Sequence, residues 1–346
     1  VEINATGNIT FDGESSRSIP SGVFSQVNPG AVGNAGGVKI FTSNLTLSNG
    51  GRATSDTLGR GNAGVTNITA NGDISIDGQN SMGFNSGVSS QVGDGAVGNA
   101  GGVTISTNNL TLTNGGGIGA STFSEGNAGI ANITAKENII IDGEDSDGFT
   151  SGINSQSNPV AKGDAGGVII STNNLTLTNG GQIDASIGGQ GNGGSVNITA
   201  TGDIVFDGQN SEGLRSGATS IVGDSAVGDA GGVTISTNNL TLTNGGRVSA
   251  STLGQGKAGE LEIGANALNL DNNAVISSQS ESTFKAGDIT LNIANSLEAK
   301  DSEISTSSTQ SSGGNLTIAA GDIRLRGDSD LRTDINSGAG GGGNID

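Results

Sequence analysis

Apolar and polar residues alternate along most of this chain in short runs. In residues 98–125, the run VTIS places Val103 and Ile105 on one side of the chain and Thr and Ser on the other. The run LTLT does the same with Leu110 and Leu112. A period of two residues is typical of β-strands with one buried face. Asn and Gly fill the connectors, where they tolerate a positive φ, and helical spacing is absent, so the pattern predicts an all-β protein.

The whole pattern repeats every 65 residues. The run GNAGGVKIFTSNLTLSNGG, which begins at Gly33, returns with few changes from Gly98, Gly163 and Gly228. A second opening of the same kind, at Gly126, divides the repeat into coils of 28 and 37 residues. The longer coil carries about eight extra residues between its second and third strands. A fixed period of this kind indicates a repeat architecture.

Three strands per coil can share one core if each strand pairs with the same strand in the neighbouring coils. The sequence therefore predicts a parallel β-helix, a solenoid of about eleven coils with three short strands per coil. We expect a single domain over residues 1–346. Residues 1–255 would alternate 28- and 37-residue coils, and residues 256–346 would form more uniform coils of about 28 residues.

Composition restricts both the core and the partners. Glycine accounts for 64 of 346 residues, aromatics for 2%, and Trp, Tyr, His and Cys are absent, so the core must be aliphatic. The net charge of −19 is not offset by a basic cluster, which argues against nucleic acid as a partner. No run of 18 apolar residues occurs, so membrane insertion is not predicted.

The repeat also resembles a known family. The pattern GNAGxVxI…LxLxNGGxIxAST…GNAGxxNITAxxxIxIDG covers nearly the whole chain. It is similar to the repeat region of filamentous-haemagglutinin-type exoproteins secreted by the two-partner route, the cyanobacterial ones in particular. The resemblance implies a right-handed β-helix, an outer-membrane secretion partner during export, and a secreted or cell-surface adhesin. It places the expected localisation outside the cell.

We expect a rod-like extracellular adhesin or surface exoprotein segment, a rigid spacer whose weak contacts add through multivalency. Its partner would be an unidentified glycan or protein of a cell surface or matrix. One alternative is a filament or sheath subunit, because both ends of the chain interrupt a strand and end-to-end self-association would cover them. The third alternative is an enzyme acting on polysaccharide. Catalytic and cofactor-binding residues are not predicted, because no unique cluster suits acid–base catalysis.

One aspartate recurs in each long coil. These residues are Asp12, Asp77, Asp142 and Asp207. Equivalent positions two coils apart are separated by about 9.6 Å, too far to share a proton as a catalytic pair does. These four aspartates are therefore interpreted as parts of Asp-Gly turns that close the second strand of each long coil.

Calcium is the one candidate cofactor. The run DSDG at 145–148 resembles the start of a calcium loop, with Asp145 and Asp147 as candidate ligands. The sibling runs NSMG at 80–83, NSEG at 210–213 and SSRS at 15–18 do not keep these carboxylates. A metal site built into the repeat is therefore not predicted.

The extra residues of the long coils also carry one apolar side chain each, at Ile19, Phe84, Phe149 and Leu214. If exposed, Phe84, Phe149 and Leu214 would form a surface-binding loop series. The alternative is that each side chain folds back and pins its loop to the rod. Ten N-x-T triplets, including those at Asn44 and Asn109, are candidate glycosylation sites or by-products of turn asparagines.

Overall fold

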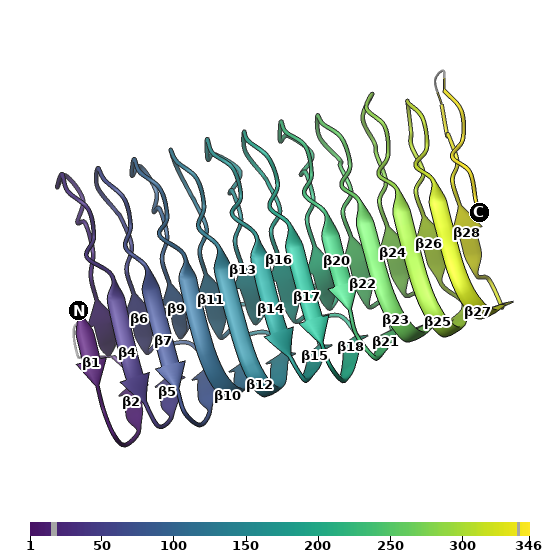
Figure 1. The fold of residues 1–346 in the computed structure, drawn as a ribbon. Helices are drawn as coiled ribbons and strands as arrows, with labels where there is room; N and C mark the ends of the chain where they lie inside the picture. Colours follow the sequence, from purple (N-terminus) through teal and green to yellow (C-terminus); the bar gives the residue numbers. More distant parts are fainter. Residues whose placement is uncertain (15–18, 338–339) are drawn as a thin grey trace.

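The strands of the protein stack side by side in two parallel sheets (Figure 1). The computed structural model describes residues 1–14, 19–337 and 340–346. Within these residues, the first sheet has 17 strands: β1 (Glu2–Asn4), β2 (Ile9–Asp12), β4 (Val38–Thr42), β5 (Leu45–Ser48), β7 (Thr66–Ala70), β8 (Ile74–Asp77), β10 (Val103–Thr113), β12 (Ala131–Asp142), β14 (Val168–Thr172), β15 (Asn174–Thr178), β17 (Val196–Ala200), β18 (Asp203–Asp207), β20 (Val233–Ser236), β21 (Asn239–Thr243), β23 (Leu261–Asp271), β25 (Ile289–Lys300) and β27 (Leu316–Arg326).

The second sheet lies behind the first in Figure 1 and is made of three-residue strands. Its 11 strands within the described residues are β3 (Gly22–Phe24), β6 (Arg52–Thr54), β9 (Gly87–Ser89), β11 (Gly117–Gly119), β13 (Gly152–Asn154), β16 (Gln182–Asp184), β19 (Gly217–Thr219), β22 (Arg247–Ser249), β24 (Val275–Ser277), β26 (Glu303–Ser305) and β28 (Asp330–Arg332).

Each strand pairs in parallel with its counterpart in the next turn of the chain. Glu2 of β1 lies opposite Lys39 of β4, and Val38 of β4 lies opposite Thr66 of β7. Steps of 37 and 28 residues alternate in this way along the first sheet. Between β23 and β25 the step is again 28 residues, because the extra loop of the long turns is missing there.

The fold prediction is wrong as stated and is corrected here. The first two predicted strands of a coil lie in one sheet. In five turns of the described chain, they are one continuous strand of 11 or 12 residues, in β10, β12, β23, β25 and β27. The Asn-rich connector between these two strands was expected to form a turn. In β10 it is instead a register shift between Thr107 and Asn109, and the chain stays extended across it. The structure is therefore two parallel sheets of 17 and 11 strands, and not a right-handed parallel β-helix solenoid with three short strands in each coil.

The core lies between the two sheets and is mostly aliphatic. The alternation predicts which side chains point inward, and this prediction is confirmed, because the following are all buried: Val103, Ile105, Leu110, Leu112, Val168, Ile170, Leu175, Leu177, Val233, Ile235, Leu240 and Leu242. The expectation of a core too narrow for rings is wrong at one place, since Phe206 is completely buried.

The repeated GNAG motif forms a ladder of side chains that joins successive turns. The Oδ1 atom of Asn34 accepts a hydrogen bond from the backbone N–H of Asn62 at 2.8 Å, and Asn62 accepts in the same way from Asn99 at 2.9 Å. The ladder continues through Asn127 to Asp164. Each of these residues satisfies a backbone donor of its neighbour, which explains why the motif returns in every turn.

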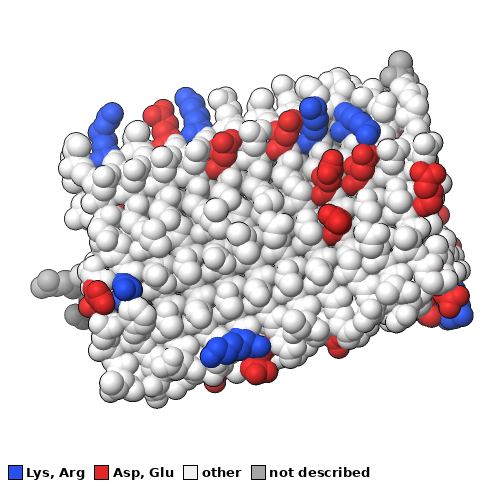
Figure 2. Space-filling view, in the orientation of Figure 1, with Lys and Arg blue, Asp and Glu red and all other residues white. Residues whose placement is uncertain are grey.

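Charged side chains avoid the middle of the face formed by the first sheet. Figure 2 shows that Lys, Arg, Asp and Glu on this face gather along its upper and lower margins. The outward residues of β7 and β10 are Asn67, Thr69, Thr104 and Ser106. Among the described residues, no helix is long and apolar enough to cross a membrane.

Phe206→Ala should destabilise the protein by about 3–5 kcal/mol, because it leaves a cavity where a completely buried ring packs in the core. Urea unfolding followed by circular dichroism measures the change. Phe149→Ala removes the same ring from an exposed loop and should change stability by less than about 0.5 kcal/mol. If Phe206→Ala lowered the free energy of unfolding as little as Phe149→Ala is expected to, the ring of Phe206 would contribute nothing to the stability of the core.

Candidate functional site: a trough on the second sheet

A trough runs along the outer face of the second sheet. Its floor follows one register position, which is occupied in turn by Arg52, Gly87, Gly117, Gly152, Gln182, Gly217 and Arg247. Four of the five positions between the two arginines are glycine, and the fifth is Gln182. Gly152 and Gly217 are buried, so the floor is open at the level of the backbone at Gly87 and Gly117. Six ladder steps of about 4.8 Å make the trough about 29 Å long.

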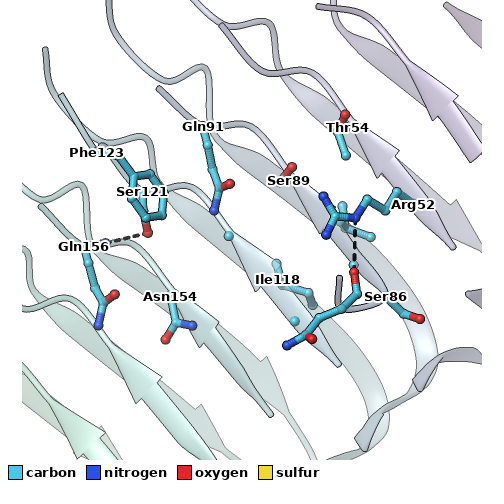
Figure 3. Close-up of a pocket in the computed structure, with 15 residues that line it drawn as sticks. Arg52, Thr54, Ser86, Ser89, Gln91, Ile118, Ser121, Phe123, Asn154 and Gln156 are labelled. Carbon is cyan, nitrogen blue, oxygen red and sulfur yellow. Dashed lines mark hydrogen bonds between the residues drawn. The ribbon is translucent and has the colours of Figure 1, made fainter. Parts of the chain in front are cut away.

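The trough is hollowed at the end near Arg52, where it forms a cavity of about 190 Å³ (Figure 3). Gln91 and Phe123, which follow β9 and β11, line one side, and Asn85, which precedes β9, lines the other. The amide of Gln91 occupies the space above Gly119, where an added Cβ would lie only 2.4 Å from Nε2. A side chain at that glycine would therefore displace Gln91.

Several polar groups in this cavity have no protein partner. Among the described residues, the side-chain amides of Gln91 and Asn154 make no hydrogen bond. The same holds for the two Nη groups of Arg52, whose Nε donates to the carbonyl oxygen of Asn85 at 3.1 Å. The guanidinium carbon of Arg52 also lies 5.5 Å from the centre of the Phe84 ring. Two amides and one guanidinium are thus oriented by their surroundings and free to bind a ligand.

The neighbouring polar groups are already engaged. The backbone N–H of Gln156 donates to Ser121 Oγ at 3.0 Å, as Figure 3 shows. Asp56 Oδ1 accepts from the backbone N–H of Gln91 at 2.8 Å and from Ser89 Oγ at 2.9 Å. Burial raises the pKa of Asp56 despite these hydrogen bonds. Burial likewise lowers the pKa of Arg52, and the negative charge of Asp56 opposes that shift.

Sequence reasoning missed the trough and singled out the neighbouring loops instead. Phe84, Phe149 and Leu214 are 45%, 62% and 44% exposed, and the ring of Phe84 still reaches back to Arg52 of β6. The sequence did contain a pattern for the trough: glycine recurs every 65 residues at Gly22, Gly87, Gly152 and Gly217.

Asp145 and Asp147 lie in a loop whose geometry needs no metal. Asp145 Oδ1 accepts hydrogen bonds from the backbone N–H groups of Asp147 and Phe149, both at 2.9 Å. Asn80 Oδ1 accepts two equivalent bonds in the preceding long turn. The side-chain amide of Asn80 therefore accepts the same two backbone hydrogen bonds as the carboxylate of Asp145. Within the described residues, no group of three or more His, Cys, Asp or Glu could hold a metal ion, and the sibling run at 15–18 lies outside those residues.

The repeated aspartates anchor the turns of their neighbours. Asp77 Oδ1 accepts from Thr113 Oγ1 at 2.6 Å and from Asn114 Nδ2 at 2.7 Å. Asn114 has a φ of 50°, so the carboxylate holds a left-handed residue in place. Asp12, Asp142 and Asp207 make the matching pairs of bonds. Bonds from Ser48 and Asn49 lower the pKa of Asp12, although burial opposes them.

Four asparagines of the N-x-T triplets form a second ladder: Asn44, Asn109, Asn174 and Asn239. Asn109 Nδ2 donates to Asp73 Oδ1 at 2.8 Å, and Asn44 Nδ2 donates to Asn8 Oδ1 at the same distance. In these four, the nitrogen that would carry a glycan is engaged between turns, which favours the structural interpretation of their triplets. Asn197 Nδ2 instead donates within its own turn, to Ser195 Oγ.

Comparison with known proteins identifies no relative of this chain. No protein-family model, curated protein or solved structure matches the chain.

Asp56 should make stability depend on pH. Its pKa is raised in the folded protein, so the folded state binds the proton more tightly, and stability should rise as the pH falls through the folded pKa toward the ordinary value of 3.8. Asp56→Asn should lose this increment, so the difference in unfolding free energy between wild type and variant should change across that range. Urea titrations at a series of pH values measure it. A difference in unfolding free energy that does not change with pH would contradict a raised pKa of Asp56 in the folded protein.

Proposed function

We propose that this protein is a rod-like extracellular adhesin segment that binds a linear glycan along the trough of its second sheet, with neutral sugar residues in the cavity near Arg52. The observation that carries the proposal is the set of free polar groups, the Gln91 and Asn154 amides and the Arg52 guanidinium, above a floor of glycine. Its resemblance to filamentous-haemagglutinin-type exoproteins supports a secreted or cell-surface location and export through an outer-membrane partner.

The chemistry of the trough suits a sugar. An amide both donates and accepts hydrogen bonds, as a sugar hydroxyl does, so Gln91 and Asn154 can each pair with hydroxyl groups. Phe123 offers an apolar ring at the edge of the same cavity for the C–H face of a pyranose. Gly87 and Gly117 in the floor leave room beside this cavity for a chain that extends beyond one sugar.

The shape of the trough predicts weak binding at each site. A cavity of about 190 Å³ is smaller than the about 300–1,000 Å³ that encloses a drug-sized ligand. Repetition on a stiff two-sheet rod would compensate, because several weak contacts with one surface add through effective concentration. Asp56, the carboxylate nearest to these groups, is held by Ser89 and Gln91, and this supports binding over catalysis.

Gly117→Val tests the proposal. An added Cβ at Gly117 meets no atom closer than 4.0 Å, so the variant should fold, and its side chain should fill the trough. Isothermal titration with cellohexaose should show binding to the wild type and at least about tenfold weaker binding to the variant.

Gly264→Val is the matched control. Gly264 lies in β23 of the first sheet, and an added Cβ there also meets nothing closer than 4.0 Å. This variant should bind cellohexaose as the wild type does. Wild-type affinity in Gly117→Val, or no binding of cellohexaose to the wild type, would refute a neutral glycan site in this trough.

A further inference from the structure

The far end of the trough holds two arginines in a second cavity. This cavity has a volume of about 280 Å³ and is lined by Arg215 and Arg247 together with Gln182, Asp184 and Thr219. Arg247 begins β22, next to Gly217 in the ladder, and Arg215 comes from the loop that precedes β19. A chain with only 14 Lys and Arg residues thus places two of them in one small space.

Neither arginine has an acidic partner at ion-pair distance among the described residues. Arg247 Nε is buried and makes no hydrogen bond there. Arg215 uses one Nη1 hydrogen to reach the carbonyl oxygen of Asn273 at 3.3 Å. A buried donor without an acceptor is costly, and a ligand that accepts hydrogen bonds from this guanidinium would lower that cost.

Asp184 shares the cavity without neutralising both guanidinium groups. One of its oxygens accepts from the backbone N–H of Ser186 at 2.8 Å and from the Ser186 hydroxyl, and the other accepts from Gln156 Nε2 at 2.5 Å. Burial lowers the pKa of Arg247, the negative charge of Asp184 opposes that shift, and the nearby charge of Arg215 adds a smaller lowering. Two positive charges against one negative charge leave the cavity with a local excess of positive charge.

We propose that Arg215 and Arg247 bind the carboxylate of a uronic acid residue in the glycan that occupies the trough. Guanidinium groups pair with carboxylates through two parallel hydrogen bonds, and both arginines line the cavity, Arg247 without a protein acceptor for its Nε. This inference rests on the proposed glycan function and adds the substrate class: an acidic glycan whose neutral sugars lie toward Arg52 and whose uronate lies at Arg247.

The net charge of −19 does not oppose this site at physiological salt. The repulsion between an acidic glycan and the distant carboxylates is screened beyond about 8 Å. The contacts to Arg215 and Arg247 act at hydrogen-bond distance and are screened much less. Binding of the uronate should therefore weaken only modestly as salt increases from low to physiological concentration.

Two variants and a matched control test the site. Arg247→Gln and Arg215→Gln should each bind an oligogalacturonate about tenfold or more weakly than the wild type, as measured by isothermal titration. Arg324→Gln removes the same charge from an exposed ion pair with Glu298 on the first sheet, and it should bind like the wild type. Thermal unfolding of each variant checks that it remains folded.

The outcomes separate this inference from the proposed function. If cellohexaose binds and oligogalacturonate does not, or binds equally well to all three arginine variants, the uronate site is wrong and the neutral site stands. If oligogalacturonate binding depends on Arg215 and Arg247 while cellohexaose fails to bind, the acidic site stands and the neutral site is wrong. If Arg324→Gln weakens binding as much as Arg247→Gln, the effect is one of overall charge and the site is refuted.

Discussion

The parallel backbone ladder between each turn and the next is the constraint on which the rest of the structure depends. A ladder keeps its hydrogen bonds only if the strand positions of one turn face the same positions of the next, so long insertions fall outside the strands, and inside them the register shifts by one residue at most, as between Thr107 and Asn109. The long turns meet this condition because their extra residues project between β8 and β9, and between β12 and β13, as small hairpins. The inward aliphatic side chains then stack on their own counterparts and form a core without further specification.

The same close stacking makes the trough. An added Cβ at Gly217 would lie 2.0 Å from the carbonyl oxygen of Arg247, and one at Gly22 would lie 1.9 Å from that of Arg52. Glycine is therefore required at the start of these strands for packing, and a bare floor is the consequence. The short turns are not restricted in this way. They place Arg52, Gly117, Gln182 and Arg247 at the equivalent position.

The two-residue alternation in the sequence predicted which face of each strand is buried. It predicted little of the structure that depends on residues outside the repeat. The inward faces of the strands follow from alternation alone, and the anchoring role of residues such as Asp77 follows from turn chemistry. The merging of two strands into one in β10 and β12 does not follow from the sequence pattern. The same Asn-rich connector can turn or stay extended, and packing between neighbouring turns determines which conformation it adopts. The position of Phe206 carries Phe11, Ile76 and Ile141 in the other long turns, and only the space between the sheets determines that a ring is completely buried there.

The trough was missed for a related reason. Its floor is made of residues with no side-chain chemistry, and its polar groups come from different turns, such as Gln91 and Asn154, that never form a motif along the chain. Only stacking brings them together. In a repeat protein, the conserved pattern within the repeat encodes the scaffold, so specificity has to reside in the positions where one turn differs from the next. Arg52 and Arg247 occupy such positions, and the glycines between them let a single extended ligand contact both ends.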